Sequence, residues 1–200
     1  MSILRYITET KDKGYLSLNG VEFEEVDELP PTISLNKIVS TLRKILPYHY
    51  FKNLEKVVIQ HLEEFNERHI TAIYKDGVFY ITNKQENIED ILDDAVHELA
   101  HHVETQYKDH IYGSGDVSKE FLNKRSQLNH ELRSEGYWTD EYDFKDINYN
   151  NQLDDFLYKR VGRNMMKMVT SGLFMRPYSS ISLREYFATG FEAYYLGKKD

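Results

Sequence analysis

Two histidines and a glutamate form the densest chemical pattern in the sequence, in the stretch AVHELAHHVE from Ala95 to Glu104. On a helix, His97 and His101 lie one turn apart on the same face, so both imidazoles can bind one metal ion. A zinc ion held by two histidines and a third protein ligand keeps one coordination position open for water. Glu98 can then act as the general base that takes a proton from that water. The HELAH pattern therefore indicates a zinc site suited to hydrolysis.

The helix that carries this pattern is predicted from about Asn87 to Gln106 by a stripe of apolar side chains. This stripe lies roughly opposite the two histidines, so core packing and metal binding use different faces. Its members are Ile88, Ile91, Leu92, Ala95, Val96, Leu99 and Val103. The alternative is a solvated polar face on which the HExxH match is accidental. His102 lies toward the apolar stripe, which indicates a core histidine or one that supports a ligand.

The third zinc ligand must come from elsewhere in the chain. His110 and His130 are candidates on spacing alone. Glu185, in the apolar and aromatic stretch SLREYFATGFEAYYLG, is a better candidate because an isolated carboxylate near a core needs a partner. The competing explanation is a capping box, in which the Glu185 side chain binds the backbone N–H of Ser182 at a helix start. Taken alone, these residues favour the cap.

A resemblance changes this balance. HELAHH and the later YSSISLREYFATGFEAYYL resemble the zinc endopeptidase family of the anthrax lethal factor catalytic domain and the clostridial Pro-Pro endopeptidases. That family combines HExxH with a downstream tyrosine and a segment of the form E-F/Y-F-A-x-x-F. The resemblance implies that the zinc ligands are His97, His101 and Glu185. It also implies that Glu98 is the general base.

The family's tyrosine, seven residues before the ligand glutamate, falls on Tyr178. The resemblance implies that this phenol donates a hydrogen bond to the oxyanion of the transition state. The competing role is packing in a loop beside Arg176 and Pro177. The chain departs from the family in two ways. His101 and Glu185 are 84 positions apart (185 − 101), which indicates an insertion at about 109–171, and Thr189 replaces the usual second acidic residue.

Local patterns predict the elements that position these residues. Strands are expected in a hairpin at 15–26 around Asn19-Gly20, near 56–60, and at 70–82, as two antiparallel strands joined at Asp76-Gly77 or one bulged strand. Other helices are expected from Ser34 to Pro47 and at 118–134, 153–169 and 182–196. Together they predict an α+β fold: one zincin-like metallopeptidase domain over 1–200, with a small, mostly antiparallel sheet, the HExxH helix and a C-terminal ligand helix.

Three further stretches suggest specific roles, each with a simpler alternative. The strand expected at Val78–Thr82 is a candidate edge at which an extended peptide adds a strand, or an ordinary core hairpin. Asp146, Asn148 and Asn150 have calcium-loop spacing, but the turn glycine and closing glutamate are missing, so a polar loop is expected. The segment from Tyr137 to Phe156 is expected to form a surface loop, with a lid or a partner-binding surface above the cleft as the alternative.

The composition excludes several classes of function. The 33 acidic and 25 basic side chains leave a net charge of −8, which argues against a nucleic-acid partner. The sequence contains no cysteine, so a metal must be bound by His, Asp or Glu. No membrane span is expected, and the opening MSILRYITETKDKGY lacks the apolar core of a signal peptide. We expect a cytoplasmic protein or one released without a Sec signal; a phage or toxin setting is an alternative that no residue establishes.

These observations predict a zinc-dependent endopeptidase that cleaves polypeptides, with Zn²⁺ as its metal. Two alternatives stay open. A regulatory HExxH peptidase of a mobile element would share the chemistry but need a partner protein. A structural or interaction protein would keep the zincin fold without activity. The sequence indicates neither the substrate preference nor the oligomeric state.

Overall fold

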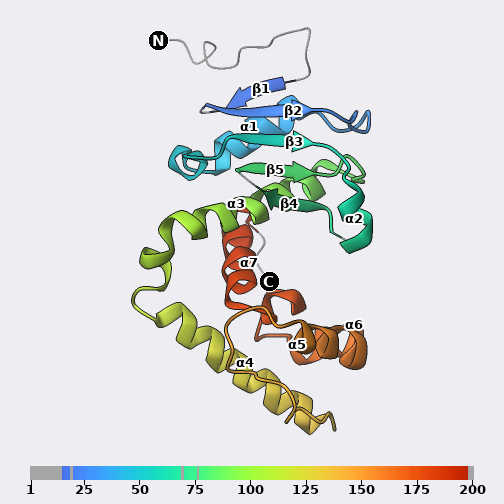
Figure 1. The fold of residues 1–200 in the computed structure, drawn as a ribbon, viewed down its shortest axis with the longest axis vertical. Coiled ribbons are helices and arrows are strands. Elements are labelled where there is room, and N and C mark those ends of the chain that lie inside the picture. The colour runs from blue at the N-terminus through green and yellow to red at the C-terminus, as the bar shows by residue number, and fades with distance from the viewer. Residues whose placement is uncertain (1–14, 19, 69, 76, 198–200) are drawn as a thin grey trace. The chain divides into compact units, whose positions relative to one another are not determined.

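The computed structural model describes residues 15–18, 20–68, 70–75 and 77–197. The chain forms two compact units, Met1–Val103 and Glu104–Asp200 (Figure 1). The first unit contains a sheet with helices, and the described part of the second unit is helical. The α+β class expected from the sequence is therefore confirmed.

The described residues of the first unit form a sheet of five strands in the order β1-β2-β3-β5-β4 (Figure 1). The strands are β1 (Tyr15–Leu18), β2 (Val21–Glu25), β3 (Lys56–Ile59), β4 (Ala72–Lys75) and β5 (Val78–Ile81). The pairs β1–β2 and β4–β5 are antiparallel, whereas β3 runs parallel to both of its neighbours. The sheet is mixed, so the prediction of a mostly antiparallel sheet is wrong.

The parallel pairing follows from the helix between β2 and β3. Parallel neighbours need a crossover connection, and α1 (Leu35–Ile45) provides it. Ser34 is the N-cap of α1, as expected, although its carbonyl rather than its side chain accepts the first helical hydrogen bonds. A 3₁₀ turn, η2 (Tyr48–Phe51), then leads into β3, which confirms the strand expected near 56–60.

Both predicted hairpins are present. Leu18 pairs with Val21 across the first turn, where Gly20 has a φ of 90°. After the short helix α2 (Glu63–Arg68), β4 and β5 form two separate strands, so the bulged single strand is excluded. Gly77 has a φ of 83° in the second turn. The predicted turn partners Asn19 and Asp76 lie outside the described residues.

Helix α3 (Ile88–Tyr112) packs on the sheet together with α1. Phe23, Val57 and Phe79 are neighbours in register on β2, β3 and β5, so their side chains point to the same face. Leu42 of α1 and Leu99 of α3 meet these side chains in the core. Every member of the predicted apolar stripe of α3 is buried. This packing fixes which side of α3 faces away from the sheet.

Besides the end of α3, the second unit contains six helical segments among its described residues. They are α4 (Asp116–Ser134), α5 (Asn151–Asp155), the π-helix η3 (Phe156–Val161), α6 (Arg163–Val169), the 3₁₀ turn η4 (Pro177–Ser180) and α7 (Leu183–Leu196). The helices predicted at 118–134 and 182–196 are confirmed. The single helix predicted at 153–169 is wrong, because Gly162, with φ 83° and ψ 158°, breaks it between η3 and α6.

The core of this unit is a cluster of apolar side chains from α4 to α7. Phe121, Leu128 and Leu132 form a fully buried row on α4. Phe174 and Leu183 pack into the same cluster and bring the stretch before α7 against α4. Among the described residues, we find no helix with the length and apolar character that crossing a bilayer requires.

Candidate metal centre

The two histidines of the HELAH pattern are neighbours on α3. Their ring centroids are 4.9 Å apart and the rings are nearly perpendicular. His101 is buried and His97 is half-buried. The helical repeat accounts for this arrangement, because residues four apart stack on one face. Both rings therefore sit where a single ion could meet them.

His97, His101 and Glu185 form a group that could hold a metal ion. Each offers one ligand atom, and these atoms all lie within 4.8 Å of one another. Around a tetrahedral zinc with bonds of about 2 Å, ligand atoms are about 3.4 Å apart. No other group of three His, Asp or Glu residues with this property occurs in the described parts of the chain.

Glu185 lies in the first turn of α7, where two explanations compete. The Ser182 hydroxyl accepts a hydrogen bond of 3.2 Å from the backbone N–H of Glu185, so Ser182 does cap the helix. This bond uses the main chain of Glu185 and leaves its carboxylate in the group with the histidines. The cap and the candidate ligand are therefore compatible.

His102 behaves as the predicted core histidine. Its side chain is buried, and its Nε2 lies 2.9 Å from the carbonyl oxygen of Lys52. A carbonyl only accepts, so Nε2 carries the proton. On the other side, Nδ1 is 3.4 Å from the hydroxyl of Tyr74 on β4. Burial lowers the pKa of His102, and its contacts join α3 to β4.

Asp94 is a half-buried acid to which the sequence analysis gave no role of its own. It lies one turn before Glu98 on α3. Burial raises the pKa of its carboxyl to about 6, and the nearby charge of Glu98 contributes to the rise. The side-chain amide of Gln85 donates a hydrogen bond of 2.7 Å to it. Helix α3 carries several acidic residues, and the sequence alone does not show which of them is shielded from water by packing.

Glu104 is a second acid with a role that its sequence position did not reveal. Its side chain is only 13% exposed. Tyr112 donates a hydrogen bond of 2.7 Å to one carboxylate oxygen, and Arg184 lies 3.2 Å from the other. Arg184 directly precedes Glu185. The signal available in the sequence was only the position of Glu104, three residues after His101 on the same helix.

Tyr178 lies in η4 and is 54% exposed. On one side of it, Arg176 forms a 2.5 Å ion pair with Glu192 of α7, whose side chain is 2% exposed. On the other side, buried Arg125 of α4 donates to the carbonyl oxygens of Ser180 and Ile181. An ion pair on one side of Tyr178 and hydrogen bonds on the other therefore hold the segment that carries it.

Arg125 is the largest fully buried side chain in the part of the chain that the structure describes. It also donates to the carbonyl of Asp143, and its guanidinium stacks near the rings of Phe121 and Phe144. Burial lowers its pKa to about 10, a value at which it still carries its charge at neutral pH. Sequence reasoning missed this residue because an arginine on a helix is usually at the surface.

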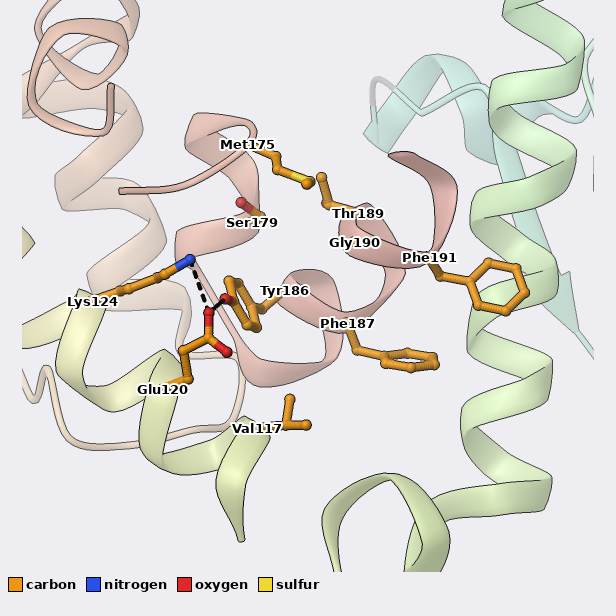
Figure 2. Close-up of a pocket in the computed structure, with 10 residues that line it drawn as sticks. All are labelled: Val117, Glu120, Lys124, Met175, Ser179, Tyr186, Phe187, Thr189, Gly190 and Phe191. Atoms are coloured by element: carbon orange, nitrogen blue, oxygen red, sulfur yellow. Dashed lines mark hydrogen bonds and ion pairs between the residues drawn. The ribbon is translucent and has the colours of Figure 1, made fainter. Parts of the chain in front are cut away.

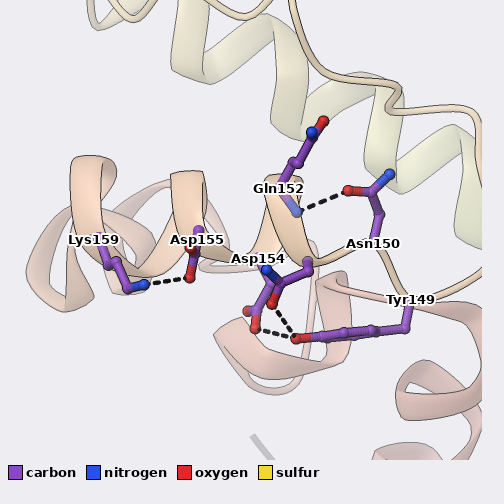
Figure 3. A network of polar contacts seen from close by, with 7 residues as sticks. Tyr149, Asn150, Gln152, Asp154, Asp155 and Lys159 are labelled. Carbon is purple, nitrogen blue, oxygen red and sulfur yellow. Dashed lines mark hydrogen bonds and ion pairs between the residues drawn. The ribbon is translucent and has the colours of Figure 1, made fainter.

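The other ligand candidates do not join the metal group. His110 and His130 are both exposed. In the stretch with calcium-loop spacing, Asp146 accepts hydrogen bonds from Asn148, and Asn150 caps α5. Figure 3 shows Asn150 accepting from the backbone of Gln152. These side chains serve local turns and caps, as expected of a polar loop.

Of the two roles left open for Val78–Thr82, the structure supports the strand inside the sheet. Val78–Thr82 was a candidate edge strand, but β5 is paired with β3 on one side and β4 on the other. Among the described strands, β1 and β4 are the outermost. The edge strand that contacts α3 is thus β4, through Tyr74 and His102.

A pocket of about 340 Å³ lies beside α7 and contains none of the candidate ligands. In Figure 2, Lys124 and Tyr186 both reach Glu120 on one side of it, while Phe187 and Phe191 lie on the other. Gly190 also lines this pocket.

Comparison with protein-family models, curated proteins and solved structures found no match to this chain.

Proposed function

We propose that the protein is a zinc-dependent endopeptidase of zincin-like fold. The observation that carries the proposal is the group of His97, His101 and Glu185, whose ligand atoms lie within 4.8 Å of one another. Two imidazoles and one carboxylate are a donor set that suits zinc. The motifs that resemble the lethal factor and Pro-Pro endopeptidase family contain these same residues and add independent support.

When bound, zinc would act as a Lewis acid that polarises the substrate carbonyl and makes water more acidic. Glu98 directly follows the ligand His97, so its carboxylate takes the proton from the attacking water and later returns it to the leaving amine. Tyr178 donates a hydrogen bond to the oxygen on which negative charge develops.

An extended polypeptide is the substrate that this arrangement suits. Strand β4 lies at an edge of the sheet, and its Tyr74 contacts α3 one residue after the ligand His101. A peptide that adds to this edge would pair its backbone with β4 and run alongside the histidine helix.

The decisive experiment is Glu98→Gln in the full chain. This variant should bind zinc as tightly as the unaltered protein and cleave a peptide library at least 10²-fold more slowly, because it removes only the base. Zinc content by metal analysis and cleavage by mass spectrometry provide the two readouts.

Three outcomes separate the alternatives. If Glu98→Gln cleaves at the normal rate, the mechanism is wrong. If the unaltered protein binds zinc but cleaves no peptide in the library, the structural or interaction role is favoured. If it cleaves one protein alone and only with a partner present, the regulatory peptidase is favoured.

A further inference from the structure

We infer that Glu104 is a positioning residue that holds the proposed zinc ligand Glu185 in place through Arg184. This inference rests on the proposed zinc site and concerns a residue outside the HExxH motif. The carboxylate of Glu104 would bind neither metal nor substrate. Its role would be to fix the first turn of α7, which supplies Glu185, to the C-terminal part of α3.

Helix α3 is uninterrupted between the histidine ligands and Glu104. His101 and Glu104 are three residues apart, so they lie on adjacent turns of the same helix. The backbone of α3 departs from helical geometry at Tyr107, which comes after Glu104. Glu104 and the histidines therefore lie on one stretch of helix with no break between them.

Glu104 is attached to α7 by an ion pair with Arg184. Its Oε2 lies 3.2 Å from Nε of Arg184, in the first turn of α7. The next residue is Glu185, whose backbone N–H is held by Ser182. An arginine anchored at this point limits how far the first turn of α7 can rotate or slide, and with it the carboxylate of Glu185.

The carboxylate of Glu104 is held by a partner at each of its two oxygens. Its second oxygen accepts a hydrogen bond of 2.7 Å from Tyr112, so two partners from different elements fix its carboxylate plane. The Glu104 side chain is largely buried, whereas Arg184 is 53% exposed. A largely buried carboxylate paired with a half-exposed arginine is a stronger constraint than an ion pair in open solvent.

The test compares zinc affinities of full-length variants by chelator competition with Zn²⁺ as the only ligand. Glu104→Gln keeps the shape of the side chain but loses its charge, and it should raise the zinc Kd about tenfold. Arg184→Gln should have a similar effect. The double variant should be little weaker than either single variant, because both changes remove the same interaction. The absorption spectrum of bound Co²⁺ should change in all three.

A matched control is Lys159→Gln, which breaks the exposed ion pair with Asp155 on the same unit and should leave the zinc Kd unchanged. Glu104→Gln with normal zinc affinity and a normal Co²⁺ spectrum overturns the inference, even if the metal-free protein melts at a lower temperature. If Glu104→Gln does not fold, Arg184→Gln, which changes a half-exposed residue, decides the question in the same way.

Variants of the ligands distinguish this failure from failure of the zinc site. Glu185→Gln and His101→Ala should weaken zinc binding more than Glu104→Gln does. If both retain normal zinc affinity, the proposed function fails together with the inference. If both lose affinity while Glu104→Gln retains it, only the positioning role is wrong.

Discussion

At the scale of single residues, the acids and bases near HELAH differ in how well the sequence revealed them. His97 and His101 are spaced by the helical repeat, so local geometry alone groups them. Asp94 and Glu104 are acids on the same helix as Glu98. Their roles, however, depend on which partners the fold brings to them. The sequence near Glu104 does not predict its ion pair with Arg184, which lies 80 positions later (184 − 104).

The charge of Asp94 should make the stability of the metal-free protein depend on pH. The folded-state pKa of about 6 exceeds the ordinary 3.8, so the folded protein binds more protons between these values and loses stability as pH rises through them. The loss should be about 3 kcal/mol at most, from about 1.4 kcal/mol for each pKa unit. Urea unfolding with chelator present, at pH 4 and pH 7, measures it.

Asp94→Asn provides the comparison for this prediction. The asparagine keeps an oxygen that accepts from Gln85 but cannot ionise. The free energy of unfolding of the unaltered protein minus that of the variant should therefore fall between pH 4 and pH 7. A difference that stays constant over this range would mean that Asp94 ionises as it does in water.

Tyr178 permits a test of the oxyanion role. Tyr178→Phe removes only the hydroxyl and should lower kcat about a hundredfold, while the zinc Kd stays unchanged. Tyr194→Phe is the control, because the side chain of Tyr194 on α7 is 79% exposed. Equal kcat values for the two variants would leave Tyr178 with a packing role only.

At the scale of elements, helix starts and tight turns were the most predictable features. Ser182 and Ser34 mark helix starts in the sequence and hold those positions in the fold. The sheet topology was predicted incorrectly because each strand was judged alone. The helix between β2 and β3 already implied a crossover, so the parallel pair was within reach of the sequence. The break at Gly162 was not, since an isolated glycine within a helical pattern is often tolerated.

Substitution by alanine should change stability in opposite directions at two glycines, one inside α7 and one between η3 and α6. Gly190→Ala adds a methyl group where nothing lies within 4 Å, in the interior of α7, and should stabilise the protein by about 0.5–1 kcal/mol. Gly162→Ala forces a side chain onto a φ of 83° and should destabilise it by about 1 kcal/mol or more. Thermal unfolding of both variants measures the contrast, and a shift of the same sign in both would refute it.

At the scale of the whole molecule, the strongest expected effect is that of the metal on stability. A ligand that binds only the folded protein stabilises it by about 2.7 kcal/mol at a hundredfold excess over its Kd. We therefore expect Zn²⁺ to raise Tm by several degrees and a chelator to reverse this. Mg²⁺ at the same concentration is the control, because imidazole ligands suit zinc and not magnesium. Equal shifts with both ions would argue against the histidine site.

The shortness of β4 sets a limit on what the protein could recognise. Four strand residues span about 13 Å, so the sheet edge can align only a brief run of backbone. A folded target would have to present that run in an unstructured tail or a loose linker. Selectivity would then depend on where a target is locally unfolded as much as on its amino acids.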